Sequence, residues 1–474
     1  MSEYKDYKLP EGWKFSTIPE LIGKSGFFSD GDWVESKDQD PDGDVRLIQL
    51  ADIGDGVYRN KSSRFLTSKN AKKMRCKFLI EGDILIARMP DPLGRACIFP
   101  GDIKKSITAV DVCIIRSSNN EFNHRWLMWF INTPKVRSLI NNLQSGSTRK
   151  RISRKNLGTI ALPVPPIQEQ QVIVAEIEKQ FTRLDAGVAA LKRLQINLKR
   201  YRAAVLKAAC EGKLVPTEAE LARREGREFE TASVLLERIL KERREKWMEK
   251  NPKKKYVEPK GPDMSNLAEL PEGWCWATVD QIGQVQLGKM LDKTKHTKGK
   301  KLTYLRNINV RWGRIGTDDL LEMFFKISEL ERFNLKKGDV LVCEGGEPGR
   351  SAVWDGRNAL MKYQKALHRV RFWGNYEPQL IIYLLEFLAK TGRLEKLFTG
   401  STVKHFTRES FIKLAVPLPP LREQYRIISE VERRLSVNEE MELAVDANIM
   451  RSERLRQAVL QRAFEGKILS KNHF

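Results

Sequence analysis

Two short segments combine small residues with cations in a pattern that suits contact with phosphate groups. The first consists of Gly146, Ser147, Thr148, Arg149, Lys150, Arg151 and Arg154. The second consists of Gly400, Ser401, Thr402, Lys404 and Arg408. Small and hydroxyl residues let backbone amides approach a phosphate oxygen, and the cations neutralise its charge. A turn with solvated charges is the alternative. Because both segments keep the small residues and a cation two positions after the threonine, we favour contact with DNA.

Two further loops are candidates for DNA contact. They span Arg88 to Gly94 and Glu344 to Gly349, and each lies between a predicted strand and a Gly-Arg pair. The loops differ in sequence, as expected of parts that read different bases. The shared cations Arg95 and Arg350 are either contacts to the DNA backbone or members of structural ion pairs.

Other side chains could take part in reading or in packing. The amides and guanidinium of Gln49, Arg306 and Asn307 are chemically able to read base edges. Trp13 and Trp274 occupy the same place in two similar stretches of the chain. We interpret these tryptophans as core anchors rather than as base-stacking groups.

The patterns of a catalytic or metal centre are missing. No Asn-Pro-Pro or Asp-Pro-Pro is followed by an aromatic residue, as an S-adenosylmethionine site would require. Residues 283–289 have the spacing of a phosphate loop, but Met290 stands where that loop needs a hydroxyl. The five histidines are dispersed, and the aspartates of residues 38–44 lack the closing glutamate of a calcium loop. We therefore predict no catalytic residue, no metal site and no cofactor on this chain.

The charge of the chain favours a polyanionic partner. Lys and Arg number 84 against 61 Asp and Glu, which gives a formal net charge of +23. Such a surplus repels itself unless an anion lies against it, and nucleic acid is the first expectation. A generally basic, solvated surface is the alternative. No segment approaches the ~20 apolar residues that a membrane span needs. The cysteines are scattered and the first eight residues are polar, so we expect a cytoplasmic protein without a membrane partner.

The chain repeats itself at the scale of a whole domain. The repeated segments are residues 9–13 and 270–274, 79–86 and 335–342, 94–95 and 349–350, 145–148 and 399–402, 161–166 and 415–420, and 204–213 and 458–467. They keep their order at an offset far longer than that of solenoid repeats. The sequence therefore predicts two related modules, each with the same internal plan.

Within each copy, short alternating strands precede a hydrophobic helix. The first copy predicts strands at Asp83 to Ala87 and Ala109 to Ile115, followed by a helix at Arg125 to Ile140. The matching helix of the second copy is predicted at Pro378 to Phe398. A proline-rich break then ends the globular part, because consecutive prolines cannot continue a helix but suit the entry to the next one.

A long helix is predicted after each proline-rich break. The apolar positions of the first are Ile177, Phe181, Leu184, Val188, Leu191, Leu194, Leu198, Tyr201 and Val205. Those of the second are Val431, Leu435, Val445, Ile449, Leu455 and Val459, interrupted by Asn438. Their steps of three and four are those of a coiled-coil seam. Gly212 and Gly466 suit left-handed helix caps. We expect the two helices to pair antiparallel, as a rod that holds the globular domains apart.

These elements predict an α+β protein with two globular α/β-mixed target-recognition domains, separated by two long helices packed as an antiparallel coiled coil. The predicted segments are 1–162, recognition domain 1; 163–213, helical region 1; 214–268, a charged connector; 269–416, recognition domain 2; and 417–468, helical region 2. The connector includes a predicted helix at Ala232 to Lys250 and the basic run at residues 253–255. A solvated linker and a DNA contact are equally open for it.

The whole chain resembles the specificity subunits (HsdS) of type I restriction–modification systems. The resemblance rests on the doubled Leu-Pro-Glu-Gly-Trp openings, the Gly-Asp strands, and the Pro-x-Pro-Pro-x-x-Glu-Gln helix starts at 163–170 and 417–424. The helix endings with Ala-Val-Leu and Glu-Gly-Lys complete it. Each motif alone is weak, but their repeated order is specific.

The resemblance implies that each recognition domain reads one half of a split, asymmetric DNA site. It also implies that the helical regions dock two methylation subunits, which restriction subunits join. S-adenosylmethionine, ATP and magnesium would be bound by those partners and not by this chain. Two domains on a fixed rod could contact major-groove faces one helical turn, ~34 Å, apart, so the helices would act as a ruler.

Three alternatives remain open at this stage. They are a stand-alone DNA-binding regulator, a specificity subunit of another restriction system with a bipartite site, and a duplicated protein-interaction scaffold whose charge keeps it soluble. A scaffold predicts a shallow salt dependence of any DNA binding, whereas neutralisation of phosphates predicts a steep one.

Overall fold

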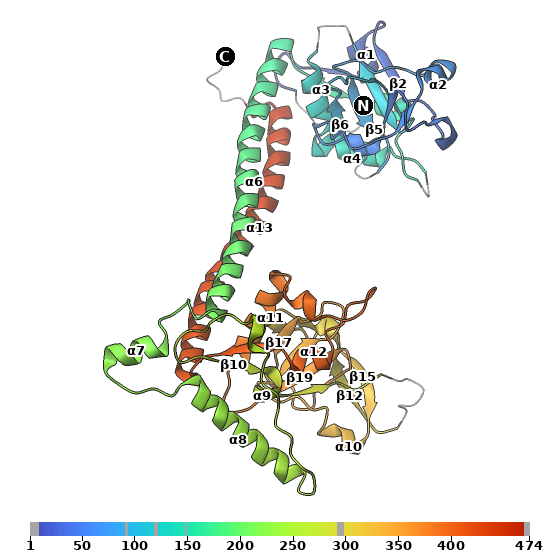
Figure 1. Ribbon diagram of the computed structural model, residues 1–474. Helices are drawn as coiled ribbons and strands as arrows, with labels where there is room; N and C mark the ends of the chain where they lie inside the picture. Colours follow the sequence, from blue (N-terminus) through green and yellow to red (C-terminus); the bar gives the residue numbers. More distant parts are fainter. Residues whose placement is uncertain (1–8, 91–92, 118–121, 147–148, 292–297, 469–474) are drawn as a thin grey trace. The chain divides into compact units, whose positions relative to one another are not determined.

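The computed structural model describes residues 9–90, 93–117, 122–146, 149–291 and 298–468 (Figure 1). The chain forms two compact units, each of which draws on both halves of the sequence. Unit 1 contains Met1–Arg193 and Val445–Phe474, and unit 2 contains Leu194–Ala444. We call the mixed α/β part of unit 1, before residue 165, the first module, and that of unit 2, after residue 268, the second module.

Two small sheets form the centre of the first module. The first sheet has the order β2 (Phe27–Asp30), β8 (Val112–Arg116), β5 (Ile84–Ala87), β6 (Ala96–Ile98), and all its pairs are antiparallel. The second has the order β4 (Phe65–Leu66), β3 (Val45–Ile48), β7 (Lys105–Thr108), with β3 and β7 parallel. A two-stranded ribbon pairs β1 (Lys14–Ser16) with β9 (Leu162–Val164).

The alternation of β5 explains how these layers pack. All four of its side chains are buried, so this strand has no solvent face. Ile84 and Ile86 belong to the core beneath the helices, whereas Leu85 and Ala87 belong to a second core that also contains Ile48 of the other sheet. Successive side chains of a strand point to opposite faces, so one strand supplies both cores. The strand predicted at Asp83 to Ala87 is confirmed, and the strand predicted at Ala109 to Ile115 begins later, at Val112.

The helices of the first module are short. They are α1 (Ile18–Ile22), α2 (Ser68–Lys73), α3 (His124–Ile131), α4 (Pro134–Asn142) and α5 (Arg154–Gly158). The single helix predicted at Arg125 to Ile140 is wrong, because the chain breaks between α3 and α4. Pro134 cannot donate a backbone hydrogen bond, and Thr133 instead caps the new helix by accepting from the amide of Val136.

The second module repeats this plan. Its main sheet has the order β11 (Gly283–Leu287), β19 (Leu367–Phe372), β16 (Val340–Cys343), β17 (Ser351–Val353), and its smaller sheet β15 (Leu321–Phe325), β12 (Lys300–Leu305), β18 (Lys362–Tyr363). A ribbon pairs β10 (Cys275–Thr278) with β20 (Ala415–Leu418), and the helices are α9 (Val279–Ile282), α10 (Ile327–Leu330), α11 (Pro378–Lys390) and α12 (Arg408–Ile412). The identical strand orders confirm the duplication. A short hairpin joins β13 (Val310–Arg311) to β14 (Arg314–Ile315).

The helix predicted at Pro378 to Phe398 is shorter than expected. The α-helix α11 ends at Lys390, and Gly392 follows with a φ of 68°. This left-handed conformation turns the chain out of the helix, and a separate 3-10 helix, η6, covers Leu394–Leu397. The periodic apolar pattern alone does not reveal this interruption.

The repeated motifs form one hydrogen-bonded junction in each module. The indole Nε1 of Trp13 donates to both carboxylate oxygens of Glu169 at 3.1 Å. In the second module, the indole Nε1 of Trp274 donates to one carboxylate oxygen of Glu423 at 2.9 Å. Both tryptophans are buried, which confirms that they are core anchors. The Leu-Pro-Glu-Gly-Trp and Glu-Gln motifs therefore join the start of each module to the long helix that follows it.

Two helices of 44 residues follow the proline-rich breaks. They are α6 (Ile167–Cys210) and α13 (Leu421–Phe464). Gly212 and Gly466 follow them with φ of 66° and 68°, so both predicted glycine caps are confirmed. Unit 1 contains the start of α6 with the end of α13, and unit 2 contains the end of α6 with the start of α13. The two helices therefore pair antiparallel within each unit.

Charged contacts fix this pairing. In unit 1, Arg456 of α13 forms an ion pair with Asp185 of α6 and lies 4.1 Å above the ring of Phe181. In unit 2, Arg202 of α6 contacts Glu439 of α13 at 3.1 Å and Glu386 of α11 at 2.7 Å. Cross-helix ion pairs thus occur in both units.

The seam is less continuous than its spacing predicts. Leu194, Tyr201 and Leu455 are exposed, although they fall at predicted seam positions. The buried residues lie mainly toward the helix ends, where Ile177 packs against the first module and Val205 against the second. Nearer the middle, Leu198 of α6 and Val445 of α13 are also buried. A straight α-helix drifts relative to a strict seven-residue repeat, and here the modules rather than a helical partner cover the terminal turns.

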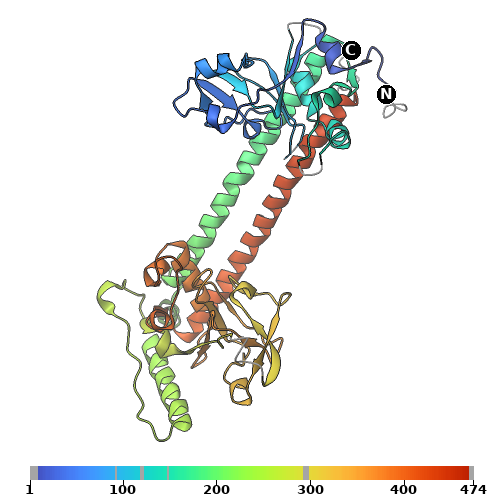
Figure 2. The same ribbon diagram turned by 90° about the vertical axis from the view of Figure 1, so that its right-hand side faces the viewer.

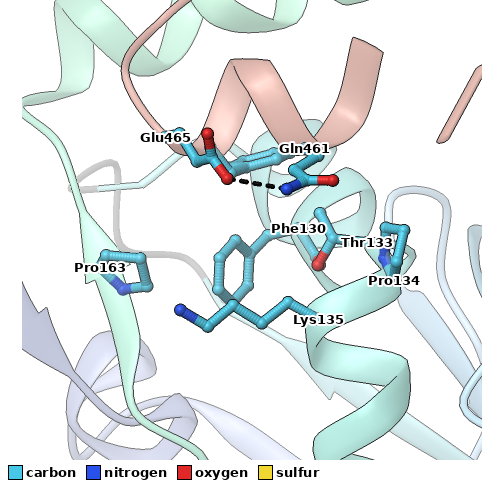
Figure 3. A pocket seen from close by; sticks show the side chains of 8 residues that line it. Phe130, Thr133, Pro134, Lys135, Pro163, Gln461 and Glu465 are labelled. Atoms are coloured by element: carbon cyan, nitrogen blue, oxygen red, sulfur yellow. Dashed lines mark hydrogen bonds between the residues drawn. The ribbon is translucent and has the colours of Figure 1, made fainter. Parts of the chain in front are cut away.

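The end of α13 completes the core of the first module. Leu460 and Phe464 belong to the same core as Trp126 and Phe130 of α3, and both are buried. A cavity of about 60 Å³ remains at this junction, lined by Lys135 of α4, by Gln461 of α13 and by Glu465, which follows that helix (Figure 3). Burial lowers the pKa of Lys135, and the nearby Glu465 opposes that shift. Gln461 donates to Glu465 across one turn.

The connector is folded rather than extended. It contains α7 (Glu218–Glu225) and α8 (Ala232–Lys250), and the helix predicted at Ala232 to Lys250 is confirmed. Leu235 and Ile239 of α8 are buried in the core of the second module. The chain then runs back beside α8, where the ring of Tyr256 lies 5.3 Å from that of Trp247 (Figures 1 and 2).

Candidate DNA interface

A closed loop presents the cations of the first module. Residues 145–151 form what we call the first strap. Ser145 and Arg151 exchange two backbone hydrogen bonds, of 2.8 and 2.9 Å, which close the loop. Gly146 has a φ of 100°, a conformation that favours glycine. Arg149, Lys150 and Arg151 are all exposed, whereas Ser147 and Thr148 lie outside the described residues.

The second module has the same device, the second strap, at residues 399–405. Thr399 and His405 exchange two backbone hydrogen bonds of 2.9 Å, and Gly400 has a φ of 92°. The exposed members that the sequence singles out are Ser401, Thr402 and Lys404. His405 stands where the first strap has Arg151, and exposed Val403 stands where it has Arg149. The second strap is therefore less basic than the first.

Each strap is fixed to its main sheet at its end. The amide of Ile152 donates to the carbonyl of Arg88 at 3.1 Å, and the amide of Phe406 donates to that of Glu344 at 2.8 Å. The Arg88 side chain is buried, pairs with Asp30, and donates to the carbonyl of Ile152 at 3.0 Å. This arginine thus lies beneath the strap and supports it.

Two further predicted cations hold the backbone of the same sheet. Arg154 donates to the carbonyl of Phe28 on β2, and Arg408 donates to that of Val285 on β11. Phe28 and Val285 occupy equivalent positions in the two sheets. Phe28 pairs with Ile115 of β8, which on its other side pairs with the first residue of β5. Val285 pairs with Val370 of β19, which on its other side pairs with the first residue of β16. The side chain of Arg154 remains about half exposed, so a second contact with an anion is sterically open to it.

The shared Gly-Arg pairs stabilise a turn at the end of the smaller sheet. Arg95 donates to the carbonyl of Leu50 at 3.1 Å, and Arg350 donates to that of Asn307 at 2.8 Å. Arg350 also pairs with Glu347 at 2.6 Å. Both guanidiniums therefore contact protein groups, and Arg350 forms an ion pair, which is one of the two roles that the sequence left open.

Of the base-edge candidates, two are occupied by protein contacts. Arg306 pairs with Asp319 at 2.7 Å, and the side-chain amide of Asn307 donates to the carbonyl of Gly345 at 3.3 Å. Gln49, at the position equivalent to Arg306, instead lines an open groove.

This groove brings predicted residues of the first module together. It has a volume of about 840 Å³. Its walls include Trp33, Gln39, Gln49, Arg64, Gly146, Arg149 and Arg151, together with the carboxylates of Asp32, Glu35 and Asp111. We call it the first groove. The first strap and Gln49, which are far apart in the sequence, thus face the same space.

Several residues of the first groove were not predicted from the sequence. Trp33 is 68% exposed, and its indole donates to Glu35 at 3.2 Å. Arg64 is exposed and donates to Gln39 at 3.3 Å. A tryptophan within the polar run of residues 30–36 is the one signal that could have marked this wall, because a large apolar side chain there has few apolar neighbours in sequence.

The second module has its groove in a different place. A space of about 450 Å³ opens beside the β13–β14 hairpin. Its basic lining residues are Arg311, Arg314 and Arg357. The second strap does not line this groove. The hairpin beside it corresponds to the turn at residues 53–58 of the first module, where Ile53 and Tyr58 form a single antiparallel bridge instead of a two-residue ladder. The two modules therefore share a scaffold and differ in the surface that it carries.

The remaining sequence patterns have structural roles. Residues 283–287 of the phosphate-loop spacing form strand β11, and buried Lys289 pairs with Glu329 at 2.5 Å, so no phosphate loop exists there. Asp44 accepts hydrogen bonds from Ser68, and its pKa is lowered by those bonds. Within the described residues, no group of three or more metal-ligating side chains is arranged around a common point. All six cysteines are free thiols.

Burial controls the ionisation of two groups beneath the second strap. His368 of β19 is buried, and this burial lowers its pKa to about 4. Its Nε2 lies 2.8 Å from the carbonyl of Phe406, so the neutral ring donates there. Burial raises the pKa of Glu344, which Lys365 and His405 partly oppose. The second strap thus rests on a neutral histidine, whereas the equivalent residue of the first module is Cys113.

The sequence matches a known family over most of its length. The family is described as the type I restriction modification DNA specificity domain, and the match covers residues 10–198 and 271–439. The chain belongs to this family. The two matched segments contain the two modules, so the predicted resemblance to type I specificity subunits is confirmed, and the specificity domain occurs twice.

Curated relatives show the same similarity along the chain. The EcoKI specificity subunit of Escherichia coli strain K12 is 24% identical, over 97% of this chain and 90% of that protein. The EcoBI specificity subunit of Escherichia coli is 23% identical, over 75% of this chain and 68% of that protein. Both are named as type I restriction enzyme specificity subunits.

Solved structures share the fold. A chain from a study of complex assembly and conformational transition of the type I R-M system has a TM-score of 0.69 and 16% identity, covering 97% of this chain and 100% of its own length. The HsdS subunit of Thermoanaerobacter tengcongensis has a TM-score of 0.55 and 17% identity, covering 98% and 99%. The fold with two modules and two long helices is therefore that of the family. None of the described helices combines the length and the apolar composition needed to span a bilayer.

Proposed function

We propose that this chain is the DNA sequence-specificity subunit of a type I restriction–modification complex and reads a bipartite, asymmetric site. Each module would bind one half-site. The observation that carries the proposal is the first groove, where exposed Arg149 and Arg151 face the same space as Gln49. Cations that neutralise phosphates beside a polar side chain that can reach base edges are the two parts of sequence-specific DNA binding.

The difference between the modules supports an asymmetric site. The strand orders are the same, yet the first groove lies at the strap and the groove of the second module lies at its hairpin. Identical surfaces would read identical half-sites. Because these surfaces differ in residues and in position, they would recognise different sequences.

The long helices would dock the methylation subunits. Val437 and Met441 of α13 lie one helical turn apart and are 48% and 50% exposed. Residues four apart share a helix face, so these side chains form a small apolar patch open to a partner. In this proposal two methylation subunits bind the helices and restriction subunits join them. S-adenosylmethionine, ATP and magnesium belong to those partners, and the complex works in the cytoplasm.

The proposal is tested by selecting duplexes from a random library with the full chain and the methylation subunits that co-purify with it. Two half-sites of different sequence, separated by a fixed gap, are expected. Enrichment of one motif only, or equal affinity for scrambled duplexes at physiological salt, would reject the bipartite reader. A chain that stays alone while binding a specific site would instead be a regulator without partner enzymes.

The apolar patch is tested by Met441→Glu. This change is expected to release methylation subunits while leaving the thermal stability of the chain unchanged, because the side chain is exposed. Val403→Glu, at an exposed apolar position on the second strap, is the matched control and should retain them. Equal retention by both variants would place the docking surface elsewhere.

A further inference from the structure

The turn at the end of the smaller sheet has the same backbone structure in both modules but carries different side chains. In the first module, the backbone N–H of Gln49 donates to the side-chain carboxylate of Asp52 at 2.8 Å. In the second, the amide of Arg306 donates to Asn309 at 2.9 Å. A one-turn 3-10 helix follows in both, η3 (Leu50–Asp52) and η5 (Asn307–Asn309). Gln49 and Arg306 therefore occupy the same position on the same turn.

The turn in the first module is held from several sides. Asp52 is fully buried, and its carboxylate accepts from the amides of Lys61 and Ser62 at 2.6 and 2.8 Å, in addition to that of Gln49. Arg95 binds the carbonyl of Leu50, the next residue. These contacts fix the backbone on both sides of the Gln49 side chain. A side chain that reads a base needs such a fixed origin, because a shift of about 1 Å breaks a pair of hydrogen bonds.

The surroundings of Gln49 are those of a base-reading position. Gln49 is half-buried, whereas Arg64, Arg149 and Arg151 around the same groove are exposed. The cations therefore lie nearer to solvent, where phosphates would pass, and the amide lies deeper. In the second module, Arg306 is paired with Asp319, so the equivalent side chain is engaged with the protein.

The chemistry of the side chain indicates which base it would read. A primary amide offers one acceptor and one donor side by side. In the major groove, adenine presents N7 as an acceptor next to N6 as a donor, and Asn or Gln binds this pair with two hydrogen bonds. Guanine presents two acceptors at this edge and cannot satisfy the amide oxygen.

We propose that Gln49 reads an adenine in the half-site bound by the first module. This inference rests on the proposed function, since it assumes that the first groove binds duplex DNA. It goes further by assigning one residue and one base. Loss of the pair of hydrogen bonds should lower the preference for A·T at one position by about 5- to 150-fold and leave every other position as it was.

The test compares Gln49→Ala and Gln49→Glu with the unchanged chain, in the duplex selection described above and in complex with the methylation subunits. Gln49→Ala should remove the preference for adenine at one position of one half-site. Gln49→Glu should move that preference to cytosine, because a carboxylate accepts from the N4 amino group. If Gln49→Ala unfolds the module, Gln49→Glu, which keeps the shape of the side chain, decides the question.

Two internal controls separate this inference from the proposed function. The half-site read by the second module should be unchanged in both variants, and Gln284→Ala, at an exposed position of β11, should change no position. No enriched motif with the unchanged chain would reject the proposed function itself. A motif that Gln49→Ala and Gln49→Glu leave intact, or one that changes at a base other than adenine, would overturn the role of Gln49 alone.

Discussion

The end of α13 should stabilise the first module although it belongs to the other half of the sequence. Phe464 is 5% exposed, and its ring lies 5.1 Å from that of Phe130 and 6.0 Å from that of Trp126. Both contacts are edge-on, at interplanar angles of 76° and 63°. We therefore predict that Phe464→Ala destabilises unit 1 specifically.

The magnitude follows from what the truncation removes. Replacing a buried phenylalanine by alanine typically costs about 3–5 kcal/mol, because apolar burial is lost and a cavity remains. The two aromatic contacts contribute about 0.5–1.5 kcal/mol each within that figure. Phe464 already borders a cavity, so its truncation removes fewer packing contacts than truncation of a fully enclosed phenylalanine. The expected cost therefore lies at the lower end of that range, near 3 kcal/mol. Domains are stable by only about 5–15 kcal/mol, so this loss is large.

Hydrogen exchange followed by mass spectrometry can assign the loss to one unit. In Phe464→Ala, the amides of β5 and β8 in unit 1 should exchange about 100-fold faster, while those of β16 and β19 in unit 2 keep their rates. Leu455→Ala, at a 44% exposed position of the same helix, is the control and should change neither set. Unchanged protection of β5 and β8, or equal loss in both units, would refute the assignment of this helix end to the first core.

Three further outcomes are expected. Joint replacement of Arg149, Lys150 and Arg151 by alanine should flatten the slope of log affinity for DNA against log salt concentration by about 2.7, because each phosphate contact contributes about 0.9. Anisotropy titration measures this slope, and an unchanged slope would show that the first strap does not contact the DNA. Arg350→Ala should destabilise unit 2 by about 1–3 kcal/mol in urea unfolding, because it leaves a carbonyl unpaired, while the first half-site stays as it was; a loss of DNA affinity at full stability would contradict this structural role. Burial lowers the pKa of His368 to about 4, so this side chain stays neutral in the folded protein but takes up a proton near pH 6.5 in the unfolded one. The free energy of unfolding of unit 2 should therefore fall by up to about 3 kcal/mol as the pH falls from about 6.5 to about 4. His368→Gln should remove that part of the pH dependence, and equal pH dependence of both chains would disprove it.

Local rules account for much of what the sequence predicted. The glycine caps at Gly212 and Gly466 and the helix at Ala232 to Lys250 depend on residues within a few positions of one another, and all three are confirmed. The break at Pro134 was also readable, because proline lacks the donor that a continuous helix needs. Over residues 125–140 the apolar period continues across this proline, but the missing donor determines the break.

The candidate site could be predicted only in part, since burial of a cation is a property of the folded chain. Arg88 and Arg149 are the same residue type, and the sequence marks both as candidates for DNA contact. In the structure Arg88 is buried under the first strap, whereas Arg149 is exposed on it. Arg154 and Arg408 bind carbonyls of strands that lie 126 and 123 residues earlier in the chain. No local pattern encodes these partners, and the wall formed by Trp33 has no repeated counterpart to reveal it.

The two halves of the chain are interdependent in structure as well as similar in sequence, because the core of each module contains the end of the other half's long helix. Each module begins its own long helix, and the end of the other copy's helix closes its core: Phe464 in unit 1, and Leu206 in unit 2. The Trp–Glu junctions at Trp13 and Trp274 fix the starts of those helices in the same way. Each long helix is therefore anchored in a different module at each of its ends. The surfaces that carry the straps and grooves lie outside these anchors, so they can differ between the modules without disturbing the junctions.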